Sequence, residues 1–74
     1  MRRRAVNSSV IQTLGYDGRN SLLEIEFRTG RVYQYFGVPP AVYNDLLNAP
    51  SLGEFYNRQI RNEYRFVEVT KPRS

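Results

Sequence analysis

The stretch "LLEIEFRTGRVYQYF", residues 22–36, decides the fold, because the length of one turn inside it sets the face on which two tyrosines lie. Before the turn, apolar residues alternate with Glu24 and Glu26, which is typical of an antiparallel strand with one buried face. After the turn, Tyr33 and Tyr35 share one face of the following strand. The sequence therefore predicts a hairpin.

The turn "RTG" can hold two or three residues. A two-residue loop pairs Arg28 with Arg31 and forces Thr29, a β-branched residue, to a positive φ angle, which is costly. A three-residue loop instead places Gly30 in the left-handed position of a type I turn with a G1 bulge. Turn chemistry therefore favours three residues.

The loop length determines the surroundings of both tyrosines. With three residues, Tyr33 pairs with Ile25 and Tyr35 pairs with Leu23, so both rings face the core. The other face then carries Val32, Gln34, Glu24 and Glu26. With two residues, both rings turn outward, where they could stack on nucleic-acid bases. A small domain needs such large rings in its interior, which also favours the core.

Strand and turn signals precede the hairpin. Residues 6–16, "VNSSVIQTLGY", predict a strand, and Asp17 with Gly18 predicts the turn to the next one. Towards the C-terminus, residues 64–69, "YRFVEV", favour a fourth strand at the sheet edge over an extended segment across the helices.

Two helices are expected between the hairpin and the last strand. The first begins at Pro39 and Pro40 and ends before Pro50, because the residue before a proline avoids helical angles. The second begins after Ser51, which forms a capping box with Glu54. Its apolar stripe consists of Leu52, Phe55, Tyr56, Ile60 and Tyr64.

The predicted fold is α+β: a three-stranded antiparallel meander followed by two helices packed on one face, with a possible short C-terminal fourth strand. Residues 6–69 form a single domain. Residues 1–5 are expected to be a basic, flexible N-terminal tail, and residues 70–74 a frayed C-terminal tail.

Composition narrows the function. The chain has no cysteine and no histidine, so disulfides, thiolate chemistry and the usual general base near neutral pH are absent. It holds no apolar run long enough to span a membrane. We expect a cytoplasmic binding protein that is not an enzyme, without cofactor, metal or membrane partner.

The net charge of +4 comes from the two ends of the chain. Arg2, Arg3 and Arg4 lie at one end and Lys71 and Arg73 at the other, while residues 5–70 carry a net charge of −1. The ends could contact phosphate, or they could be solvated tails.

Within the domain, Arg58, Arg61 and Arg65 recur at helical spacing and, with Arg31, could contact nucleic-acid phosphates. The alternative is a solvated helix face, since Glu54 stands four residues before Arg58 in the favourable orientation for an ion pair.

Glu24 and Glu26 share a strand face, and the sequence places no basic or nucleophilic partner near them. An exposed sheet surface explains them better than an acid–base pair.

From about Ser8 to Tyr64 the chain resembles the KTSC domain family. The resemblance rests on Tyr33-Gln34-Tyr35, on Val38 and Pro39, and on Ser51, Gly53, Phe55 or Tyr56, and Asn57. Members occur alone in small bacterial and phage-related proteins and at the C-terminus of some lysyl-tRNA synthetases. The resemblance implies RNA as a partner, and the alternative is another protein, docked on the exposed sheet face or edge strand.

Overall fold

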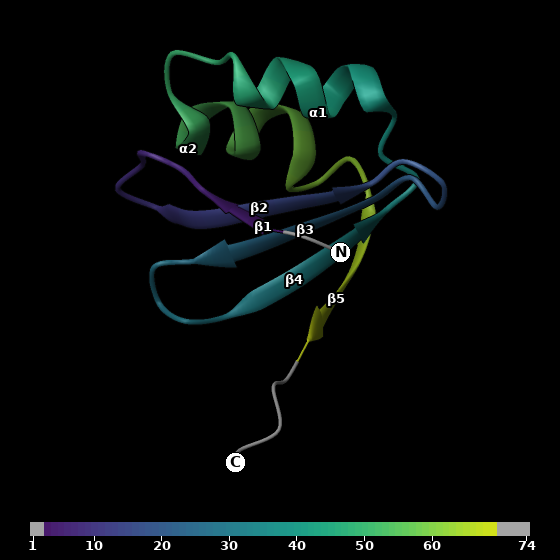
Figure 1. The fold of residues 1–74 in the computed structure, drawn as a ribbon, viewed down its shortest axis with the longest axis horizontal. Helices are drawn as coiled ribbons and strands as arrows, with labels where there is room; N and C mark the ends of the chain where they lie inside the picture. Colours follow the sequence, from purple (N-terminus) through teal and green to yellow (C-terminus); the bar gives the residue numbers. More distant parts are fainter. Residues whose placement is uncertain (1–2, 70–74) are drawn as a thin grey trace.

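The computed structural model describes residues 3–69, which form an antiparallel sheet with helices on one face (Figure 1). The strands are ordered β1-β2-β3-β4-β5, so each pairs with its neighbour in sequence. They are β1 (Arg3–Ala5), β2 (Ile11–Asp17), β3 (Leu22–Phe27), β4 (Val32–Phe36) and β5 (Arg65–Val69). The helices are α1 (Pro40–Leu47) and α2 (Leu52–Phe55), and α2 continues directly into a π-helix, η1 (Tyr56–Ile60). The predicted α+β class is confirmed.

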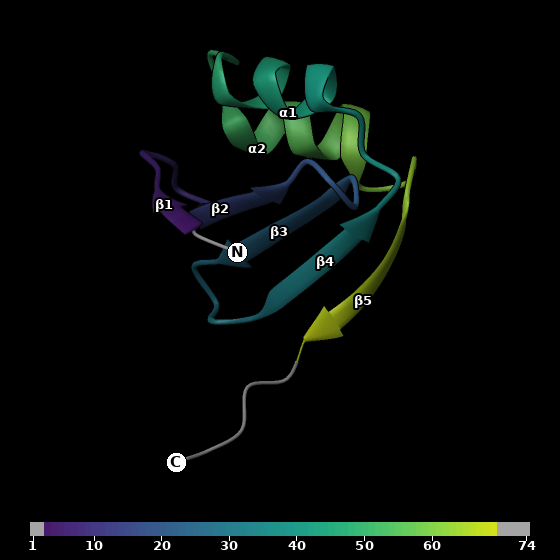
Figure 2. The ribbon, with the colours of Figure 1, turned by 45° about the vertical axis from the view of Figure 1, so that its right-hand side comes forward.

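The sheet has five strands, whereas three and a possible fourth are expected from the sequence. The C-terminal strand is confirmed as β5, which pairs with β4 at the edge of the sheet (Figure 2). The strand β1 is a correction, because residues 3–5 are expected in the flexible tail 1–5 but pair with β2. The sequence "RRA" has no apolar alternation, so its pairing depends on the backbone edge that β2 offers. The remaining tail residues, 1–2 and 70–74, lie outside the described residues.

The turn between β3 and β4 has three residues, as turn chemistry predicts. Gly30 adopts φ 95°, its N–H donates to the carbonyl of Phe27 at 2.9 Å, and the N–H of Phe27 donates to the carbonyl of Arg31 at 2.9 Å. The register follows, with Tyr33 opposite Ile25 and Tyr35 opposite Leu23. Both tyrosines therefore lie on the helix-covered face, and Val32 and Gln34 lie on the other.

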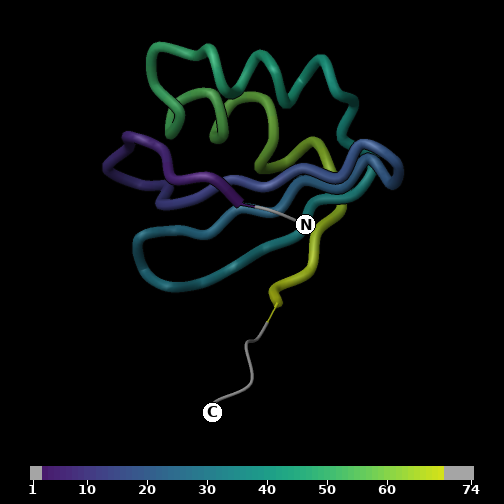
Figure 3. The backbone as a smooth tube through the Cα atoms, in the orientation of Figure 1, coloured from purple at the N-terminus to yellow at the C-terminus, as the bar shows by residue number. Residues whose placement is uncertain are grey.

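The core lies between that face and the two helical segments, whose successive turns run above the strands (Figure 3). Leu46 of α1 and Ile60 of η1 are fully buried against the sheet. Its fully buried sheet residues are Ile11, Leu14, Leu23 and Ile25, with Tyr35 at 1% exposure. Burial of such side chains contributes roughly 1.5–3 kcal/mol each.

Two hydroxyl contacts connect the sheet to the helical layer. Tyr35 and Tyr56 share a hydrogen bond in the core. Tyr16 donates to the carbonyl of Val38, and its ring stacks on that of Tyr43 at 4.7 Å between centroids. The first contact joins β4 to η1. The second joins β2 to the loop before α1 and to α1 itself.

The helix ends follow the expected signals. Pro39 precedes the first turn of α1, with Pro40 at its first position. The hydroxyl of Ser51 accepts from the N–H of Glu54 at 3.3 Å, which confirms Ser51 as the cap of α2. No helix within residues 3–69 is both long and apolar enough to cross a membrane.

The second helix widens into a π-helical turn that the sequence pattern does not predict. The N–H of Arg61 donates to the carbonyl of Tyr56 at 2.9 Å, five residues earlier, instead of four as in an α-helix. Within the described chain, no ion pair joins Glu54 to Arg58. Because of the wider turn, the side chains from Tyr56 onward do not follow the α-helical spacing that the sequence predicts.

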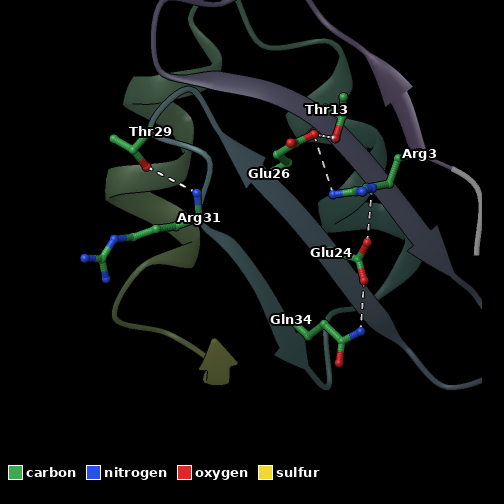
Figure 4. A network of polar contacts seen from close by, with 7 residues as sticks. All are labelled: Arg3, Thr13, Glu24, Glu26, Thr29, Arg31 and Gln34. Carbon is green, nitrogen blue, oxygen red and sulfur yellow. Dashed lines mark hydrogen bonds and ion pairs between the residues drawn. The ribbon is translucent and has the colours of Figure 1, made fainter. Parts of the chain in front are cut away.

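The sheet face away from the helices carries a polar network (Figure 4). The guanidinium of Arg3 lies 3.2 Å from Glu24 and 3.6 Å from Glu26. Gln34 donates to Glu24, and Thr13 donates to Glu26. Arg3 is therefore a basic partner of these two glutamates, whereas none is predicted near them from the sequence.

A glycine leaves room for that network. Gly15 lies between Arg3 and Glu24 in the cross-strand register, so Arg3 can reach over β2 to β3.

We expect Gly30→Ala to lower the free energy of unfolding by about 1–2 kcal/mol, because a Cβ is strained at its φ of 95°. Gly18→Ala is the control, since a Cβ there meets only the Tyr16 ring at an ordinary 3.8 Å. Urea denaturation of both variants measures the difference, and equal losses would contradict the role given to Gly30.

Tyr56→Phe should cost about 1–3 kcal/mol of unfolding free energy, because it leaves the buried hydroxyl of Tyr35 without its partner. The double variant Tyr35→Phe with Tyr56→Phe removes both hydroxyls. It should therefore be less destabilised than the sum of the single variants. Additive losses in urea denaturation would show that the hydrogen bond contributes nothing.

Candidate nucleic-acid interface

An apolar groove of about 460 Å³ opens between the β3–β4 turn, the loop before β2 and the end of η1. We name it the arginine groove, because three arginines surround an aromatic floor. Its apolar lining includes Val10, Phe27, Tyr33 and Tyr56, and its basic lining residues are Arg28, Arg31 and Arg61.

The floor consists of rings in edge-to-face contact. The ring centroid of Phe27 lies 5.6 Å from that of Tyr33 and 5.2 Å from that of Tyr56. Such geometry is favourable for aromatic pairs and holds the rings in fixed orientations. Tyr33 is half-buried, so part of its ring remains accessible from the groove.

Local hydrogen bonds position the wall formed by the loop before β2. The hydroxyl of Ser8 accepts from the N–H groups of Val10 and Ile11 at 3.1 Å each, which fixes a tight loop. The N–H of Arg28 then donates to the carbonyl of Val10 at 2.9 Å. This backbone bond connects the loop to the β3–β4 turn.

The three arginines are held to different degrees. Arg28 donates from Nε to the carbonyl of Ser8 at 2.9 Å, which restrains its guanidinium. Arg31 lies 3.5 Å from Glu68, but 64% of the Arg31 side chain is exposed, so this ion pair is weak. Arg61 is exposed and follows the last residue of η1. All three can offer N–H donors to an anion.

Beneath the groove, burial raises the pKa of the Tyr35 phenol, and the hydrogen bond with Tyr56 raises the pKa further. Tyr35 therefore stays protonated at neutral pH. Since its pKa exceeds that of the unfolded chain, ionisation of the unfolded state alone would lower stability as the pH rises above about 10. Within residues 3–69, no group of histidine, cysteine or acidic side chains could hold a metal ion.

The predicted arginine row on the second helix does not form. Arg61 lines the arginine groove, whereas Arg58 lines a different hollow beside Pro50 and Glu54. Arg65 belongs to β5 and lies opposite Phe36 on the helix-free face. The helix ends near Arg61, so helical spacing no longer applies beyond it.

Arg3 and Arg4 also lie away from the groove. Arg3 is engaged by Glu24 and Glu26 on the helix-free face. Arg4 lines another hollow, beside Leu47 of α1. Arg2 lies outside the described residues. Of the predicted contact residues, the structure brings together Arg31 and Arg61.

Most of the residues on which the resemblance to the KTSC domain family rests have a structural role. Val38 is fully buried, and Pro39 and Ser51 precede helices. A Cβ on Gly53 would approach Val10 at 3.3 Å, so glycine permits close contact between α2 and the loop. Asn57 is exposed and lines a hollow beside that loop.

Sequence reasoning missed Arg28, Phe27 and Tyr56 as groove residues. A local signal exists for Arg28, because a three-residue turn "RTG" followed by an arginine places Arg28 and Arg31 at the two ends of one tight loop. Phe27 and Tyr56 are predicted as core residues, and their partial access from the groove depends on the packing of η1.

The chain matches the model of the KTSC domain over residues 7–64. It is 44% identical over 62 residues to a lysine–tRNA ligase of Nostoc punctiforme. The aligned segment covers 84% of this chain but only 11% of the ligase. It is also 43% identical over 70 residues to an uncharacterized protein of Stutzerimonas stutzeri, covering 93% of this chain and 99% of that protein.

A solved structure is also similar. The crystal structure of a KTSC domain protein from Yersinia pestis has a TM-score of 0.91 and 36% identity, and the match covers 93% of this chain and 97% of that one. Family model, relatives and structure agree along nearly the same residues, and the chain belongs to the KTSC domain family.

Proposed function

We propose that the protein is a small, non-catalytic module that binds single-stranded RNA in the arginine groove. The observation that carries this proposal is the meeting of Arg28, Arg31 and Arg61 around an aromatic floor. Of the described residues, none with a carboxylate lines the groove. The local charge is therefore positive, although residues 5–70 together carry −1.

The two chemistries of the groove suit the two parts of an unpaired nucleotide. The face of a base is apolar and polarisable, and stacking on an aromatic side chain contributes about 1–3 kcal/mol per base. Phosphate oxygens accept charge-assisted hydrogen bonds from guanidinium groups, which bind them in bidentate geometry. Binding of this kind tolerates many sequences, because every base has an apolar face.

Relatives support an RNA partner indirectly. The segment similar to this chain is a small part of a protein named lysine–tRNA ligase in Nostoc punctiforme and also in Trichormus variabilis. An enzyme that acts on tRNA is a context in which an additional RNA-binding surface would be useful.

A protein partner is the second candidate, and one observation favours it. Phe36 and Val67 are 43% and 48% exposed on adjacent strands, and both lie on the helix-free face. An apolar patch beside an edge strand is a common docking surface. Capture of one protein that resists both nuclease and moderate salt would favour this alternative over RNA.

Arg61→Gln should weaken binding of a fluorescein-labelled single-stranded RNA several-fold and reduce the slope of log affinity against log salt by about 0.7, because one phosphate contact is lost. Arg58→Gln removes the same charge from the same helix but outside the groove, so it is the matched control. Fluorescence anisotropy between about 50 and 200 mM salt measures both. Equal effects of the two variants would contradict the assignment of the groove as the binding site. If the anisotropy of the RNA does not change when wild-type protein is added at low salt, the proposal of RNA binding is wrong.

Glu68→Gln should strengthen RNA binding a few-fold, because the carboxylate of Glu68 partly neutralises Arg31 and competes with phosphate for its guanidinium. The gain should disappear in an Arg31→Gln background. Anisotropy titrations of the single and double variants test this coupling. A gain that persists without Arg31 would mean that Glu68 acts through general charge alone.

A further inference from the structure

Phe66 on β5 is an exposed aromatic ring beside the arginine groove. It is 51% exposed, although its ring lies 5.5 Å from that of Tyr33 and 5.4 Å from that of Tyr35. It stands opposite Tyr35 in the register, so it lies on the same sheet face as the groove. The helices lie over the other strands, and β5 curves away from them (Figure 2).

Three rings therefore follow one another across three adjacent strands. Phe27 of β3 contacts Tyr33 of β4, and Tyr33 contacts Phe66 of β5. The planes of Tyr33 and Phe66 are tilted by 46°, so the two rings are not stacked face to face on each other. This row begins in the groove and ends at the free edge of the sheet.

We propose that Phe66 is a second stacking position, and that the ligand is a run of at least two consecutive unpaired nucleotides crossing from the groove to the β5 edge. The inference rests on the proposed function. Two neighbouring accessible rings suit two neighbouring bases, and a duplex could not use them because its base faces are covered by stacking.

The charges beside this row fit an RNA backbone. Arg31 directly precedes β4, and Glu68 of β5 stands opposite Tyr33. The side chains of Arg31 and Glu68 form an exposed ion pair. Arg28 and Arg61 complete the positive side of the groove. A phosphate near this point would compete with Glu68 for Arg31, so the strand has cationic partners at the step between the two bases.

Phe36 provides a matched control for Phe66. It is 43% exposed on the neighbouring strand, but it stands opposite Leu22 and Arg65, on the helix-free face. The two phenylalanines have similar size and exposure and differ in the face that they occupy. A general effect of exposed apolar area would appear equally at both positions.

The test uses a reporter that the chain naturally lacks, since it has no tryptophan. Phe66→Trp and Phe36→Trp each introduce a single indole fluorophore, and each variant is titrated with a single-stranded ten-residue oligouridylate at low salt. We expect RNA to quench the indole fluorescence of Phe66→Trp and to leave that of Phe36→Trp unchanged. Phe66→Ala should weaken binding at least about fivefold, as expected from the loss of one base stack, while Phe36→Ala should not.

Further arms separate stacking from folding and from apolar contact. Thermal melting of each variant checks that it folds, and Phe66→Leu keeps apolar cover without a ring, so it should bind as weakly as Phe66→Ala. A duplex of the same length should not quench the fluorescence of Phe66→Trp.

Two results would overturn the inference in distinguishable ways. If the wild-type chain binds the single strand while the Phe66→Trp fluorophore is not quenched, or is quenched no more than that of Phe36→Trp, the second stacking position is overturned and RNA binding stands. If the wild-type chain does not bind, both proposals fail.

Discussion

The left-handed backbone at Gly30 is the constraint on which the rest of the structure depends. It closes a three-residue turn, and the turn sets the register of β3 against β4. A shift of one residue would move every side chain of β4 to the other face of the sheet. The same turn places Arg28 and Arg31 at its two ends, so one glycine determines both the core and part of the candidate site.

The core and the arginine groove share the same cluster of rings. Tyr35 is buried and bonded to Tyr56, whereas Tyr33 and Phe27 contact the same cluster and also line the groove. In a chain of 74 residues, few large side chains are available for each purpose. An accessible aromatic floor therefore needs no separate support, because the packing that stabilises the fold also orients the rings.

Local chemistry accounts for what the sequence predicts correctly. The penalty on Thr29 at positive φ identifies the loop length, and Ser51 with Glu54 identifies the start of α2. Most of the missed features depend on contacts distant in sequence. Strand β1 has no pattern of its own, and Arg3 meets its glutamates only after the sheet forms. The groove joins the β3–β4 turn to the end of a helix about thirty residues later, which no periodicity reports.

The π-helical turn of η1 has a geometric consequence for Arg61. A π turn contains one residue more than the α turn it replaces, and each residue of an α-helix advances the direction of the side chain by about 100°. If the same residues followed α-helical geometry instead, Arg61 would be rotated further about the helix axis and would face a different direction relative to the β3–β4 turn. The place of Arg61 in the arginine groove therefore depends on the width of one helical turn as well as on the identity of the side chain.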